Sequence, residues 1–172
     1  MKSWLAKWCL GVLLFLAAQP ASATKRTTGS GTGVCLYWKN STMTYYIHED
    51  CSDDIPSIND CIAVVRAGFD VWHNTGCTSF NAVYGGTTSR TDVGFDADDW
   101  DNNINLVIFI ESGWSHESSA MALTTTTYDT EKGEIVDADV ELNGQHFDFS
   151  IDDSPGEDAY IHNTMSHEAG HT

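Results

Sequence analysis

Three residues near the end of the printed sequence have the types and spacing of a metal-dependent hydrolytic site: His167, Glu168 and His171. They form the pattern H-E-x-x-H. Residues four positions apart lie on one face of a helix, so two imidazoles at this spacing can bind one zinc ion. Glu168 follows the first histidine, where it can take a proton from a water bound to the metal. The competing interpretation is a surface helix with two solvated histidines.

A helix has to position this motif, and the residues before it carry the signals of a helix start. Ser154 has the residue type of an N-cap, Pro155 fits the first helical position, and Glu157 completes a capping box with Ser154. The sequence therefore predicts a helix that begins near Pro155 and runs into the motif.

Apolar periodicity predicts the elements that precede this helix. One helix is expected over Ser57–Asn74, with strands at 44–48, 79–84, 104–110, 120–127 and 135–142. In the strand at 135–142, apolar side chains face one way, and Asp137, Asp139 and Glu141 face the other. The apolar stripe of the helix is made of Ile58, Ile62, Val65, Phe69 and Trp72.

Length and charge limit the classes of protein that fit. The chain has 172 residues, which suggests one domain with a real core. Its formal net charge is −17, which argues against nucleic acid and anionic membranes as partners.

The first 23 residues have the pattern of a secretory signal peptide. Lys2 and Lys7 supply its positive region, 9–18 is a short apolar stretch, and Ala21-Ser22-Ala23 is a cleavage site. A transmembrane anchor is the alternative, but the apolar run is short for a bilayer. We expect a secreted protein, extracellular or periplasmic, with no stable membrane anchor. Residues 24–34 would form a flexible leader, and 35–172 would form the domain.

Four cysteines remain after the signal peptide, which in an exported chain suggests two disulfides rather than a zinc cluster. Spacing alone allows three pairings. Cys61 and Cys77 flank the predicted helix, about 24 Å apart at 1.5 Å per residue, beyond the reach of a disulfide. Two pairings remain, and a strand antiparallel to that helix would bring Cys51 near its start and Cys35 near its end. We therefore predict Cys51 with Cys61 and Cys35 with Cys77.

A cluster of aspartates follows the second predicted strand. It reads as a solvated loop or as a calcium site, because calcium prefers clustered oxygen ligands. The spacing does not fit an EF-hand. The members are Asp92, Asp96, Asp98, Asp99 and Asp101.

Four segments together resemble the catalytic domain of matrixin-like zinc metalloproteases of the metzincin clan: RAGFDVWHNTG, INLVIFI, GEIVDADVELNG and HEAGH. The resemblance implies an α/β (α+β) fold, with a twisted, mostly parallel five-stranded sheet packed on two helices. It also implies an antiparallel edge strand beside the substrate cleft and hydrolysis of protein or peptide substrates, and we expect a monomer. The strand's substrate-binding residues would be Ala120, Met121, Ala122, Leu123 and Thr124.

The chain departs from the family pattern, which continues to a glycine, a third histidine and a methionine turn. The printed chain stops at Thr172, so only two zinc ligands are assignable. We expect a poor enzyme, because the carbonyls of the last helical turn would lack capping partners and His171 would be poorly held. The remaining histidines read as structural or exposed: His48, His73, His116, His146 and His162.

Three functions remain open on these grounds. The first is a secreted zinc endopeptidase, or part of one. The second is a metzincin-like binding module without turnover. The third is a secreted acidic domain that binds calcium, in which the motif is incidental.

Overall fold

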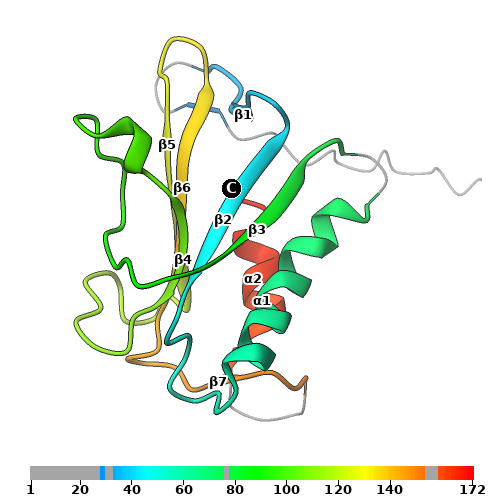
Figure 1. Ribbon diagram of the computed structural model, residues 1–172, viewed down its shortest axis with the longest axis vertical. Helices are drawn as coiled ribbons and strands as arrows, with labels where there is room; N and C mark the ends of the chain where they lie inside the picture. Colours follow the sequence, from blue (N-terminus) through cyan, green and yellow to red (C-terminus); the bar gives the residue numbers. More distant parts are fainter. Residues whose placement is uncertain (1–27, 30–32, 76–77, 154–158) are drawn as a thin grey trace, which may run out of the picture.

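The computed structural model describes residues 28–29, 33–75, 78–153 and 159–172, so the predicted signal peptide and most of the predicted leader lie outside the described residues. One twisted sheet carries helices α1 (Ile58–His73) and α2 (Ile161–Glu168) on the same face (Figure 1). This confirms the coarse α/β class with a mostly parallel sheet and two helices. Within the described ranges, no helix has the length and apolar character needed to cross a membrane.

The main sheet has six strands where five were expected. The order is β1-β6-β4-β2-β3, with β5 on the other edge of β6, and β5–β6 is the antiparallel pair. The added strand, β1, pairs with the start of β6, which is open because β4 pairs only with the end of β6. The strand bounds are Tyr37–Trp38 for β1, Thr42–His48 for β2, Asn81–Thr88 for β3, Asn105–Phe109 for β4, Ala122–Tyr128 for β5 and Glu134–Leu142 for β6.

Helix α1 begins where the sequence predicts, but its buried face differs from the predicted stripe. The Ser57 hydroxyl caps it by accepting a hydrogen bond from the Asp60 backbone N–H at 3.3 Å. Two residues of the predicted stripe, Ile58 and Trp72, are 37% and 40% exposed. The buried face is displaced around the helix, because α2 as well as the sheet packs against it, and consists of Cys61, Val65, Gly68 and Phe69.

The two helices approach each other closely at Gly68. A Cβ atom at that position would lie 2.5 Å from the Cβ of Met165, so only glycine fits the crossing. Met165 is fully buried there. The motif helix therefore packs closely against α1 at Gly68.

The motif helix begins later than predicted. A short parallel pair, β7 (Phe149–Ser150) and β8 (Ala159–Tyr160), precedes it, and the Ala159 N–H donates to the Asp148 carbonyl at 2.7 Å. Because this pairing holds 159–160 extended, a helix running continuously from Pro155 is wrong. The predicted capping residues 154–157 lie outside the described residues.

The two predicted disulfides have different outcomes. Cys51 and Cys61 are bonded, which confirms the first and ties the end of β2 to the start of α1. The second is not found, since the thiol of Cys35 is exposed and free; the backbone of Cys35 pairs in a β-bridge with Thr28. Cys77 itself lies outside the described residues.

The segment between β3 and β4, which includes a short 3-10 turn η1 (Trp100–Asn102), lies on the face of the sheet opposite the helices (Figure 1). The N–H of Gly94 in this segment donates to the Asp139 carboxylate of β6 at 2.6 Å. The acidic side of β6 is therefore covered, and Asp137 and Asp139 are each 1% exposed.

Candidate functional site

The two histidines of the motif lie ring against ring. Their Nε2 atoms are 3.2 Å apart, and the ring centroids are 4.9 Å apart. A tetrahedral zinc ion with Zn–N bonds of about 2.0–2.1 Å holds two imidazole nitrogens about 3.3 Å apart. The rings therefore have the separation of a two-histidine chelate, and the same separation allows a hydrogen bond between neutral rings.

His171 lies beyond the end of α2, in a tightened turn. The Gly170 N–H donates to the His167 carbonyl at 3.0 Å, and the His171 N–H donates to the Glu168 carbonyl at 2.8 Å. These bonds span three residues, as in the 3-10 turns that commonly end α-helices. The turn keeps the two imidazoles on one side of the backbone even though only His167 is helical.

Most carbonyls of this last turn have capping partners among the described residues, so the expectation that they would lack such partners is wrong. Strands β1 and β5 and helix α1 all pack near this turn. They supply side-chain donors that the sequence alone did not reveal. These bonds restrain the turn that carries His171. The bonds are Trp72 Nε1 to Ser166 O (2.7 Å), Thr124 Oγ1 to Glu168 O (3.3 Å), Thr172 Oγ1 to Ala169 O (2.9 Å), Thr126 Oγ1 to His171 O (3.3 Å) and Trp38 Nε1 to Thr172 O (3.0 Å).

Glu168 is 7% exposed and lies between the histidines and the edge strand. Its Oε2 accepts a hydrogen bond of 2.6 Å from the Thr124 hydroxyl of β5. The side chain lines a pocket of about 400 Å³ together with His167. A carboxylate that faces this pocket beside an imidazole is placed to accept a proton from a molecule bound there. The rest of the lining is Met121, Ala122, Asn163 and Thr164.

The strand expected to bind substrate lies beside the motif. Met121 and Ala122 line the pocket, and Thr124 contacts Glu168. Ala120 precedes the strand, and its carbonyl accepts from the Asn143 amide at 2.8 Å. Among the described strands β5 pairs only with β6, so its other edge over 122–126 is open to an extended chain.

A third zinc ligand is not found within the part of the chain that the structure describes. No group of three or more His, Cys, Asp or Glu side chains there is arranged to hold a metal. The other histidines have local contacts instead, as with His116, whose Nε2 is 3.2 Å from Glu141, and His162, which stacks on Tyr160. The two imidazoles fit a zinc ion, and its remaining positions would fall to water or substrate.

The aspartates of the segment after β3 are exposed and have separate contacts. Asp92 pairs with Arg90, whose guanidinium lowers the pKa of that carboxyl. The Asp96 carboxylate accepts from the backbone N–H of Asp98, and Asp99 accepts from Asn102. The calcium interpretation of this cluster stays a prediction.

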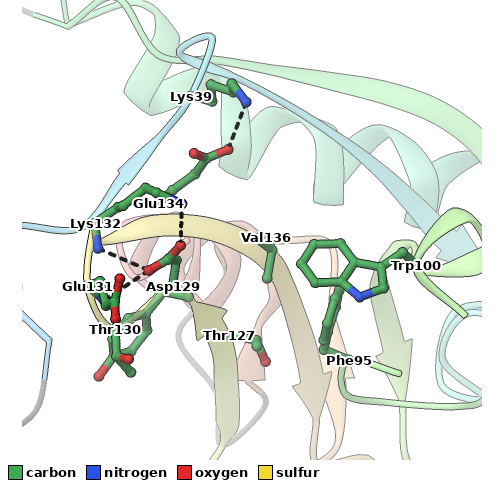
Figure 2. A pocket seen from close by; sticks show the side chains of 11 residues that line it. Lys39, Phe95, Trp100, Thr127, Asp129, Thr130, Glu131, Lys132, Glu134 and Val136 are labelled. Carbon is green, nitrogen blue, oxygen red and sulfur yellow. Dashed lines mark hydrogen bonds and ion pairs between the residues drawn. The ribbon is translucent and has the colours of Figure 1, made fainter. Parts of the chain in front are cut away.

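A larger pocket, of about 590 Å³, lies between the β5–β6 turn and the segment before β4 (Figure 2). Trp100 stands edge-on to Phe95 at one side, with centroids 4.7 Å apart, and the ion pair of Lys132 with Asp129 lies at the other. The three motif residues, all described, are not part of its lining. Chemistry at the motif therefore belongs to the smaller pocket.

Asp137 and Asp139 of β6 are two neighbouring carboxyl groups that are both buried. Asp139 accepts the N–H groups of Gly94 (2.6 Å) and Leu106 (2.8 Å), whereas Asp137 Oδ2 has no partner among the described atoms. Burial, and then the neighbouring Asp139 carboxyl, raise the pKa of Asp137 to about 7. Burial also raises the pKa of Asp139. The alternation of β6 put these residues on one face but did not show that the face is covered.

Comparison with models of known protein families and with curated proteins finds no match for this chain. The functional interpretation therefore depends on the motif, the resemblance of the sequence segments, and the geometry around Glu168.

Proposed function

We propose that the protein is a secreted zinc-dependent endopeptidase. The observation that carries the proposal is the pair of imidazoles with Nε2 atoms 3.2 Å apart, next to a carboxylate that lines a pocket beside an open strand edge. His167 and His171 would hold the zinc ion through these nitrogens. When bound, zinc polarises a water molecule and the scissile carbonyl. With two protein ligands, its affinity should be lower than at a three-ligand site.

The chain's own residues supply binding and proton transfer in this proposal. An extended substrate would pair with the open edge of β5, and the pocket beside Glu168 would receive one of its side chains. Met121 and Ala122 give that pocket an apolar wall, which favours an apolar side chain. Glu168 would accept the proton of the attacking water and pass it to the leaving amine.

Purified protein assayed with quenched peptides and added zinc tests the proposal. We expect turnover that a chelator removes and zinc restores. Glu168→Gln should keep its zinc and lose at least a hundredfold in kcat, because general-base catalysis contributes about 10²–10⁴. His171→Ala should lose zinc, measured by metal analysis. His162→Ala, on the same helix but stacked on Tyr160, is the matched control and should change neither.

Three results would contradict the proposal. Wild-type activity in Glu168→Gln would show that Glu168 is not the general base. Zinc content in His171→Ala equal to that of wild type would show that His171 is not a ligand. Bound zinc without any peptide hydrolysis would favour a binding module instead.

A further inference from the structure

The edge strand carries four consecutive threonines, and one of them contacts the proposed general base. The register of β5 on β6 pairs Thr124 with Val140 and Thr125 with Asp139. Since Asp139 faces the segment before β4, Thr125 points away from the helices and Thr124 points toward them. Thr124 thereby meets Glu168, which follows it by 44 residues.

The contact with the carboxylate is the closer of two that the Thr124 hydroxyl makes. Oγ1 lies 2.6 Å from Glu168 Oε2 and 3.3 Å from the Glu168 carbonyl oxygen. A hydroxyl has one proton to donate. The carboxylate oxygen is the better acceptor, because a hydrogen bond to a charged oxygen is shorter and stronger than one to a neutral carbonyl. Thr126 is the next threonine on this face, and within the described part of the turn its hydroxyl bonds only to the His171 carbonyl. Both threonines therefore contact backbone carbonyls of the turn, but of the two only Thr124 contacts the Glu168 carboxylate.

We propose that Thr124 is a positioning residue that fixes the rotamer of Glu168 for proton transfer. The hydroxyl holds Oε2 toward a strand that is itself fixed by pairing with β6. The described hydrogen bonds of this carboxylate end at Oε2, so Oε1 would be available to a water bound in the pocket. Reacting groups must be held within about half an ångström, and a hydrogen bond from a strand supplies that restraint on a flexible glutamate. The inference rests on the proposed peptidase function.

A first test measures the contact in metal-free protein. Urea unfolding in a chelator is measured for wild type, Thr124→Val, Glu168→Ala and the double variant. We expect the two substitutions to be non-additive by about tenfold or more in the unfolding equilibrium constant, as for a hydrogen bond to a charged group. Additive effects would mean that the contact carries no energy, which would overturn the proposal.

A second test separates positioning from a general structural role. Thr124→Val should lower kcat by about tenfold or more with little change in KM, and Thr124→Ser, which restores the hydroxyl, should recover most of the loss. Thr127→Val is the matched control, since it removes a hydroxyl from the other face of the same strand, outside the open edge at 122–126, and it should leave kcat unchanged.

The outcomes distinguish this inference from the function on which it rests. If wild type has chelator-sensitive turnover, Glu168→Gln has none, and Thr124→Val stays within twofold of wild type in kcat, the positioning role is wrong and the peptidase stands. Equal losses in Thr124→Ser and Thr124→Val would likewise overturn it. No turnover in wild type would overturn both.

Discussion

The buried carboxyl of Asp137 should make this protein less stable as the pH rises, and Asp137→Asn should remove the effect. Folding keeps the proton on Asp137, because burial and then Asp139 raise its pKa from 3.8 to about 7. Between these values the folded chain binds more protons than the unfolded chain. The stabilising contribution is therefore complete below about pH 4, is lost progressively up to about pH 7, and stays lost above that.

The structure sets the size of the effect. At about 1.4 kcal/mol per pH unit, a rise from 3.8 to about 7 corresponds to about 4 kcal/mol. Asparagine keeps the shape and stays neutral, so Asp137→Asn should match wild type near pH 4 and exceed it near pH 8 by up to that amount. In a domain of this size the gain corresponds to a Tm about 10 °C higher.

Urea unfolding in a chelator, at intervals from pH 4 to 8, measures the free energy of unfolding of both proteins. Other carboxyls titrate as well, so the informative quantity is the variant's free energy minus that of wild type. Asp139→Asn is the control, because both Asp139 oxygens accept backbone N–H groups and an amide would oppose one of them. It should destabilise by about 1–3 kcal/mol near pH 4 and by less at higher pH, because it also removes the raised pKa of Asp139 and the charge that raises the pKa of Asp137. A difference between Asp137→Asn and wild type that is flat with pH would refute the reasoning.

Two further predictions concern the packing of the motif helix against α1. Gly68→Ala should destabilise by about 1–3 kcal/mol in urea unfolding, because the new Cβ would lie 2.5 Å from that of Met165; an unchanged midpoint would show that the helices can separate without cost. Trp72→Phe removes the 2.7 Å bond to the Ser166 carbonyl and should cost about 1 kcal/mol and speed amide hydrogen exchange in 167–171. Exchange as slow as in wild type would show that the other caps suffice.

Local sequence patterns predict the helices and strands of this fold, but they do not predict which other segments pack against each element. The run at 104–110 and the alternation at 135–142 predicted β4 and β6, because a strand's own side chains record which faces are apolar. Strand β1 has two residues, too few to carry a period, and its place depends on the open half of β6. The alternation of β6 likewise cannot show that residues from the segment around Gly94 cover its acidic side.

In the candidate site, too, local contacts could be predicted from the sequence and contacts between distant segments could not. The spacing of His167 and His171 was enough to predict that their rings meet, since one turn of backbone determines it. The contact of Thr124 with Glu168 depends on the register of β5 and on the seat of α2 against it, which no local pattern encodes. The caps of the last turn were missed for the same reason, because most of their donors lie on β1, β5 and α1.

The bond between Trp38 Nε1 and the Thr172 carbonyl joins positions 134 residues apart, and it has a consequence for the folding pathway. Contacts of such high sequence separation close late, because the entropy of closing the intervening loop must be offset by structure already formed. The Trp72 and Thr124 bonds to the same turn also span 94 and 44 residues. The two imidazoles should therefore acquire their fixed separation only after the sheet and α1 have assembled, in the slowest phase of refolding.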